Sequence, residues 1–178
     1  VVGSGGLVDN MEGQSILMKA IGDIPEGISV CVGIIGDGPD MSTLRSLCQK
    51  LHIEDRVHLL GTKSQSYIRA HLCEYDLLVQ PSFIEGFGLT IVEAMAAKVP
   101  VLVSDIDGTS EAVSNGKHGA CFKVGDHCDL AKKITEIICN IDQHRRIAEE
   151  AYEYAIERYS LKNTARKYID NYTDLNEN

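Results

Sequence analysis

The sequence predicts an α/β fold with a doubly wound, Rossmann-like parallel sheet. Short apolar runs alternate with segments of helical periodicity over most of the 178 residues, which is the pattern of consecutive βαβ units. Val, Ile, Leu and Ala supply the apolar content and Trp is absent, a composition typical of strands that are buried on both faces. Glycine-rich corners follow several of the apolar runs, where a strand would turn into a helix.

Six apolar runs are expected to form the strands of this sheet. Gly, Pro and Asp residues bound most of them and would end extended structure there. The strands are expected in the segment that ends near residue 5 and at residues 28–35, 56–61, 76–80, 99–104 and 120–124. Because such sheets bind ligands at the carboxyl ends of their strands, the glycine-rich corners should open on one edge.

Helices are expected between and after these strands. Apolar residues recur at helical spacing within residues 12–22 and 41–51, and Pro39 suits the first turn of the second helix. Further helices are expected at residues 64–73, from the corner near residue 89 onward, and at residues 108–114, 126–141, 142–159 and 160–174. Together these elements predict a single domain that covers residues 1–178.

Composition argues against several classes of partner. The net charge is −9 and no basic run is present, so nucleic acid is not expected to bind. No apolar run reaches membrane-spanning length and no signal peptide is recognisable, which favours the cytoplasm. The chain opens on Val1 without a Met, as though it were cut from a longer protein.

The cysteines are not spaced like a metal site. None forms a C-x-x-C pair, and no Cys/His cluster has the spacing of a metal-binding motif. We interpret them as small buried side chains in a reducing compartment, and no metal is expected. The six cysteines are Cys31, Cys48, Cys73, Cys121, Cys128 and Cys139.

The most informative stretch is residues 80–97. An apolar run ends there at Pro81, passes through a Gly-Phe-Gly corner at residues 86–88, and continues as a helix-forming segment. A strand, a tight loop and a helix N-terminus in this order direct free backbone N–H groups at one spot. Ser82 and Thr90 are hydroxyl candidates for the same neighbourhood, either as phosphate contacts or as caps and turn formers.

Two carboxylates bracket this corner in an E-x7-E spacing. Glu85 precedes it, and Glu93 lies about one turn into the expected helix among apolar residues. A carboxylate in partly dry surroundings requires a hydrogen-bonding partner, because burial without one costs roughly several kcal/mol. A bound polyhydroxyl ligand could be that partner, whereas an ordinary surface position for Glu93 would leave its apolar neighbours unexplained.

These residues resemble the donor-sugar signature of the retaining, nucleotide-sugar-dependent family 4 glycosyltransferases, which have the GT-B fold. The likeness covers nearly the whole chain, which would be the C-terminal half of such an enzyme. It is carried by residues 81–82, 85–89, 93–96, 99–104, 108–113 and 119.

The resemblance implies transfer of a hexose from a nucleotide-diphosphate sugar to an acceptor, without a metal or cofactor. An acceptor-binding N-terminal domain, absent from this chain, would complete the enzyme and could contact a membrane peripherally. The commonest setting of such domains is the assembly of polysaccharide or glycolipid precursors.

The resemblance also implies roles for individual residues. Glu85 would be the catalytic residue at the reacting sugar, and Glu93 would accept hydrogen bonds from the ribose hydroxyls. The nucleobase would lie near Thr62 and Lys63. The donor sugar and its phosphates would be held by the corner and by the first glycine-rich loop, that is by Gly86, Phe87, Gly88, Leu89, Thr90, Gly5 and Gly6.

The first glycine-rich loop departs from the family's pattern. The family usually places an Arg in this loop and a Lys just before the following Gly, and both cations grip the donor diphosphate. Here Gly6 stands at the Arg position and Glu12 at the Lys position. Two unit charges about 4 Å apart, at an effective dielectric constant near 20, interact with an energy of about 4 kcal/mol. A Lys at this position would attract the phosphate by this amount, and a Glu would repel it by as much. Glu12 could escape the repulsion by turning outward, and Lys63 is the nearest substitute cation.

Three functions stay open from the sequence. The first is the donor-binding domain of an active glycosyltransferase, which binds the nucleotide sugar but needs the other half for turnover. The second is a non-catalytic relative that keeps the fold as a pseudo-enzyme or interaction module after losing the cation pair. The third, a response-regulator-like or flavin-binding α/β module, fits the strand alternation but leaves the E-x7-E pair unexplained.

Overall fold

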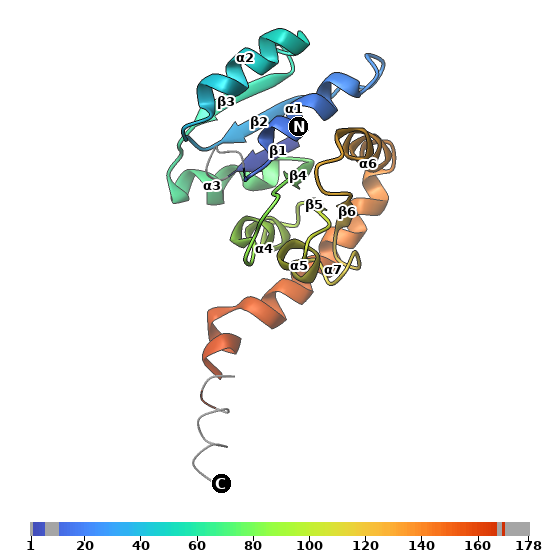
Figure 1. Ribbon diagram of the computed structural model, residues 1–178. Coiled ribbons are helices and arrows are strands. Elements are labelled where there is room, and N and C mark those ends of the chain that lie inside the picture. The colour runs from blue at the N-terminus through green and yellow to red at the C-terminus, as the bar shows by residue number, and fades with distance from the viewer. Residues whose placement is uncertain (1, 6–10, 167–168, 170–178) are drawn as a thin grey trace.

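A computed structural model describes residues 2–5, 11–166 and 169 of the chain. These residues form a six-stranded sheet with the strand order β3-β2-β1-β4-β5-β6, and its neighbouring strands are parallel. The strands are β1 (Val2–Gly5), β2 (Val32–Ile35), β3 (Val57–Gly61), β4 (Leu77–Gln80), β5 (Val101–Ser104) and β6 (Ala120–Phe122). The predicted fold class is confirmed (Figure 1).

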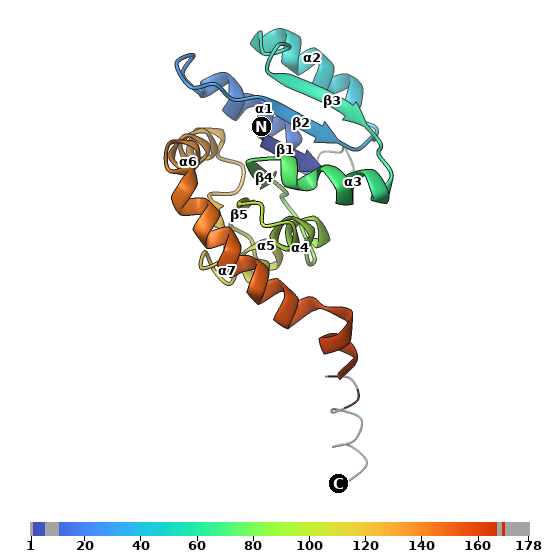
Figure 2. The same ribbon diagram turned by 180° about the vertical axis from the view of Figure 1, so that it is seen from behind.

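Helices connect the strands and cover the sheet, and the last of them extends past it toward the C-terminus (Figures 1 and 2). They are α1 (Gln14–Asp23), α2 (Met41–Leu51), α3 (Gln65–His71) with the 3₁₀ turn η1 (Leu72–Glu74), α4 (Leu89–Ala96), α5 (Asp107–Ala112), α6 (His127–Cys139) and α7 (Ile141–Tyr159). A further helix was predicted at residues 160–174. Residues 161–166 and 169 are helical, residue 160 is not, and the others lie outside the described residues. Within the described part of the chain, no helix combines the length and apolar character needed to cross a membrane.

The strands divide the core into two layers by the alternation of their side chains. Leu77 and Val79 of β4 belong to a cluster that includes residues of α1, α2 and α6. Leu78, between them, belongs to a second cluster that includes residues of α4, α5 and α7. Both faces of the strand are therefore apolar, which is why the run reads as continuous in the sequence.

The order of the strands places β1 and β4 at the topological switch point. The chain leaves β1 for β2 and β3 on one side and then returns to β4 on the other. Open α/β sheets bind ligands outside the carboxyl ends of the strands at such a point. β4 leads directly into residues 81–88, which we call the motif loop.

The second strand is shorter than predicted. Residues 28–35 form an apolar run, but β2 begins only at Val32. The carbonyl oxygen of Val30 accepts a hydrogen bond from Nε of Arg56 at 3.4 Å. A side chain thus takes the place of a neighbouring strand at this point.

Three of the six cysteines are exposed and two more are only partly buried, contrary to prediction. The exposed ones lie in the 3₁₀ turn η1 (Cys73) and near the two ends of α6 (Cys128 and Cys139), outside the apolar clusters of the core. Cys48 is buried, Cys31 and Cys121 are partly buried, and Cys73, Cys128 and Cys139 are exposed; all six are unpaired.

The first helix begins two residues later than predicted because of Gly13. This residue takes the left-handed conformation (φ 72°) at the N-cap of α1. A Cβ on Gly13 would lie 2.0 Å from the carbonyl oxygen of Pro81 in the motif loop. The connection from β1 to α1 and the motif loop therefore meet backbone against backbone.

The substitution Gly13→Ala should lower the free energy of unfolding by at least about 1–3 kcal/mol, because it adds left-handed strain to a steric clash. Urea denaturation measures the loss. Gly27→Ala is the matched control, since nothing lies within 4 Å of a Cβ there. Equal stability of the two variants would contradict the close approach of Gly13 to Pro81.

Candidate functional site

The motif loop ends in a tight corner at Gly88. This residue is left-handed (φ 71°) at the N-cap of α4, and a Cβ there would lie 2.6 Å from Cδ1 of Ile91. Its carbonyl oxygen accepts a hydrogen bond from the amide of Ile91 at 2.9 Å, so the helix begins at once. The amides of Leu89 and Thr90, the first two residues of α4, have no acceptor within the helix, and the positive end of the helix dipole lies with them.

Neighbouring loops hold the motif loop through its backbone. The amide of Phe83 donates to the carbonyl oxygen of Met11 at 2.7 Å. The hydroxyl of Ser104, at the end of β5, donates to the carbonyl oxygen of Ser82 at 2.6 Å. The position of the corner thus depends on the connections that follow β1 and β5.

Glu85, the predicted catalytic residue, is half-buried in this loop. A Cβ on Gly108 would lie 2.0 Å from its carbonyl oxygen, so the start of α5 fixes its backbone. Its Oε1 accepts a hydrogen bond from the amide of Phe87 at 3.4 Å. The Phe87 amide, predicted to bind phosphate, is therefore engaged within the loop.

A pocket of about 220 Å³ lies beside the start of α4. Its walls come from β1, from the carboxyl end of β2, from β4, and from α3, η1 and α4. Mostly apolar walls with a few converging polar groups are usual for a small-molecule site. The lining residues are Gly3, Ser4, Ile35, Gln65, Ile68, Leu72, Tyr75, Leu78, Thr90 and Glu93.

A larger hollow of about 510 Å³ lies elsewhere, next to the loops that precede β2 and β3, and Ile24 and Arg56 are among its lining residues. None of the predicted site residues lines it. The smaller pocket is therefore the candidate site.

A buried hydroxyl without a partner marks the pocket as a place for a polar ligand. Ser4 is 2% exposed, and its Oγ finds no hydrogen-bond partner among the described residues. Buried polar atoms in native proteins are nearly always hydrogen-bonded. Thr90 and Glu93, both half-buried, face the same pocket from α4.

Tyr75 forms another part of the wall. Its ring packs so closely on β1 that a Cβ on Gly3 would lie 2.9 Å from it. Burial raises the pKa of the Tyr75 phenol, so the hydroxyl stays protonated at neutral pH. The sequence analysis predicted neither Ser4 nor Tyr75 as a site residue. The one feature that could have pointed to them is their position, since Ser4 lies in the glycine-rich end of β1 and Tyr75 shortly before β4.

The pocket brings together some of the predicted site residues and leaves others out. Thr90 and Glu93 line it, whereas Glu85 does not. Gly5 ends β1 opposite Ile35, which lines the pocket. Gly6 lies outside the described residues.

The predicted nucleobase residues follow β3 and do not line this pocket. Lys63 Nζ lies 5.4 Å from the ring centroid of Tyr67 in α3, a cation–π distance. Thr62 precedes it at the carboxyl end of β3. Both residues are at the ligand-binding edge of the sheet, but Lys63 is held against α3.

Glu12 does not turn outward. Its Oε2 accepts hydrogen bonds from Nε2 of Gln80 at 3.1 Å and from Oγ of Ser82 at 3.3 Å. Gln80 Nε2 also donates to Ser82 Oγ at 2.8 Å, and both of these residues are buried. A carboxylate is thus built into the base of the motif loop, at the position where a cation was expected from the resemblance.

Comparison with known proteins identifies the family. The model of "Glycosyl transferases group 1" matches residues 1–154. The chain belongs to this family.

An N-acetyl-alpha-D-glucosaminyl L-malate synthase of Bacillus anthracis is 31% identical over 159 residues, which cover 89% of this chain and 41% of the relative. A D-inositol 3-phosphate glycosyltransferase of Corynebacterium urealyticum is 29% identical, with coverages of 98% and 43%. The chain therefore spans less than half the length of these relatives.

Solved structures agree with this assignment. Anabaena Alr3699/HepE in complex with UDP superimposes with a TM-score of 0.89 at 26% identity, over 97% of this chain and 48% of that protein. The same protein in complex with UDP-glucose gives a TM-score of 0.88. The chain matches the C-terminal half of a GT-B glycosyltransferase, and the response-regulator-like or flavin-binding alternative is wrong.

Proposed function

We propose that this chain is the donor-binding domain of a retaining, metal-independent glycosyltransferase that moves a hexose from a nucleotide-diphosphate sugar to an acceptor. One observation carries the proposal: Thr90, the second residue of α4, lines the same pocket as Glu93, one turn later. The pocket thus reaches the helix N-terminus, where unpaired amides and the helix dipole favour a phosphate. Glu93 and the unpartnered Ser4 hydroxyl offer an acceptor and a donor for ribose or base.

Glu85 is proposed to act on the donor sugar, next to the corner formed by residues 86–89. The acceptor, a polysaccharide or glycolipid precursor, would bind to the part of the relatives that this chain does not span. The described domain should therefore bind a donor without turning it over. A cytoplasmic setting suits the proposal, because the six cysteines are unpaired and stay reduced there.

UDP is the probe of choice, since it is the ligand in the HepE complex. Glu93→Ala should weaken UDP binding by about 10–100-fold, because a hydrogen bond to a charged group contributes about 1.5–3 kcal/mol. Isothermal titration calorimetry measures the change. Glu153→Ala removes an exposed carboxylate of α7 as a control. Equal UDP affinity of the two variants would refute the assignment of Glu93 to the ribose.

The position of Glu12 supports a second candidate, a pseudo-enzyme or interaction module. A carboxylate held at the base of the motif loop by Gln80 and Ser82 repels a diphosphate at the start of α4. A relative that no longer binds a donor would tolerate this charge.

Glu12→Gln discriminates between the two candidates, because it removes the charge and keeps a side chain that can bond to Gln80. A donor-binding domain should bind UDP about tenfold more tightly after this change, and Gly6→Arg combined with Glu12→Lys should add to the gain. Both gains should shrink at high salt, because salt screens the interaction of the side chain's charge with the diphosphate. Unchanged affinity in all of these variants would favour the interaction module.

A further inference from the structure

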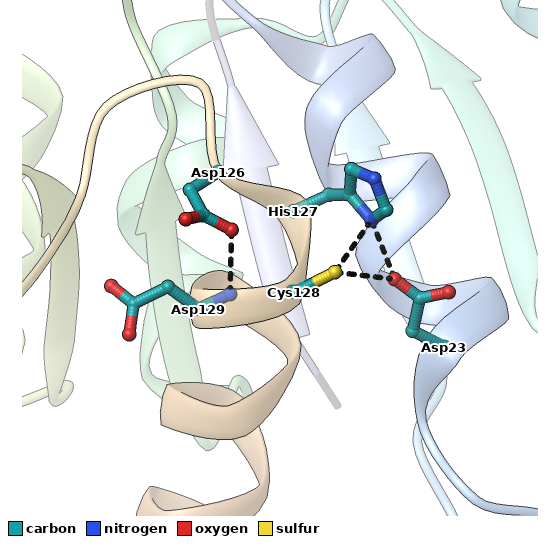
Figure 3. A network of polar contacts seen from close by, with 5 residues as sticks. All are labelled: Asp23, Asp126, His127, Cys128 and Asp129. Atoms are coloured by element: carbon teal, nitrogen blue, oxygen red, sulfur yellow. Dashed lines mark hydrogen bonds and ion pairs between the residues drawn. The ribbon is translucent and has the colours of Figure 1, made fainter.

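Three metal-ligating side chains of different kinds meet where α1 and α6 pack together. Asp23 is the last residue of α1, and His127 and Cys128 are the first two residues of α6. One donor atom of each lies within 4.8 Å of the other two. Figure 3 shows the three side chains pointing toward one another from the two helices.

The distances between the donor atoms are close to those of a tetrahedral zinc site. Bond lengths of about 2.0–2.3 Å to N, O and S place neighbouring ligand atoms about 3.3–3.6 Å apart. Cys128 Sγ lies 3.7 Å from His127 Nδ1 and 3.9 Å from Asp23 Oδ2. His127 Nδ1 and Asp23 Oδ2 are 2.5 Å apart and hydrogen-bonded, so a small side-chain rotation that separates them by about 1 Å completes the geometry.

The arrangement differs from a Cys-His-Asp catalytic triad. In a triad the carboxylate and the nucleophile use opposite nitrogens of the imidazole ring. Here both the carboxylate and the thiol approach the same nitrogen, Nδ1 of His127 (Figure 3). Convergence of three donors on one point is what a bound cation requires.

Hydrogen bonds at the start of α6 fix the backbone that carries two of the ligands. Asp126 caps α6 by accepting a hydrogen bond from the amide of Asp129 at 3.0 Å, and Asp129 accepts one from the amide of Lys123 at 2.8 Å. These two carboxylates lie away from the cluster, on the other side of the helix start (Figure 3). The first turn of α6 is therefore held in place independently of His127 and Cys128, which suits a metal site.

The packing of α1 on α6 fixes the third ligand. Leu17 and Ile21 of α1 and Leu130 and Ile134 of α6 belong to one buried cluster. Asp23 and Cys128 are nevertheless exposed and His127 is half-exposed, which leaves a path for an ion and room for water. The negative end of the α1 dipole and the positive end of the α6 dipole both lie at the cluster, so the two dipoles largely offset each other and the three side chains themselves must attract the cation.

We propose that Asp23, His127 and Cys128 bind a Zn²⁺-class divalent ion, with water in the fourth position. A thiolate, an imidazole and one carboxylate select a borderline-soft ion over Mg²⁺ or Ca²⁺. Binding releases the thiol proton of Cys128. Because Nδ1 of His127 would bind the ion, the proton of the neutral imidazole is on Nε2. None of the three residues lines the pocket of Thr90 and Glu93, so the ion clamps α1 to α6 and takes no part in donor binding.

Cobalt titration of the untagged, reduced chain tests the site directly. One equivalent of Co²⁺ should produce a thiolate-to-cobalt charge-transfer band together with the intense visible bands of tetrahedral coordination, and Zn²⁺ should abolish them. Cys128→Ser should remove the charge-transfer band and weaken Zn²⁺ binding at least about 100-fold, since even changes in the outer shell of a metal site cost 10–100-fold. Asp23→Asn and His127→Gln should also weaken binding.

Cys139→Ser is the matched control, because it removes an exposed cysteine from the other end of the same helix. It should keep the band, the zinc affinity and the rise in melting temperature that zinc produces. Mg²⁺ should bind to neither variant at this site, and UDP affinity should not change in Cys128→Ser. Lack of the charge-transfer band in the native chain, or its survival in Cys128→Ser, would overturn the proposal and leave only the hydrogen bond between His127 and Asp23.

Discussion

The candidate site depends on the approach of two glycines to carbonyl groups of the motif loop. A side chain on Gly13 would meet the carbonyl oxygen of Pro81, and one on Gly108 would meet that of Glu85, at 2.0 Å in each case. Only residues without a Cβ allow backbones to come so close. The two contacts fix the loop between the connections after β1 and β5, and this position sets the N-terminus of α4 at the switch point of the sheet.

The charge at this edge of the sheet is unusual for a site that would bind a diphosphate. The N-terminus of α4 contributes roughly half a positive charge, whereas Glu12 contributes a full negative one close to the same loop. The network of Glu12, Gln80 and Ser82 satisfies the carboxylate within the protein, so the charge is stable in the absence of a ligand. Affinity for a nucleotide would then have to come mainly from the neutral parts of the ligand in the apolar pocket.

The sequence predicted those features that depend on local periodicity or on a local motif. Strand alternation, the Gly-Phe-Gly corner and the position of Glu93 one turn into α4 were all correct, because each is decided by residues close together in the chain. The predicted extension of β2 toward residue 28 was wrong, since the Arg56 side chain competes for the Val30 carbonyl. The direction of Glu12 was also open in the sequence, because its partners Gln80 and Ser82 lie about 70 residues further along.

The same reasoning explains why a metal was not expected. Adjacent His127 and Cys128 do not form a recognisable motif, and Asp23 precedes them by more than 100 residues. Only the packing of α1 on α6 brings the three together. The N-terminal end of α1 therefore meets the motif loop through Gly13, and its C-terminal end carries the Asp23 cluster. The two ends are about 15 Å apart for a helix of this length. α1 is buried along one side between these points. An ion at Asp23 would therefore stabilise the helix whose N-cap, Gly13, packs against Pro81, although the ion lies outside the pocket of Thr90 and Glu93.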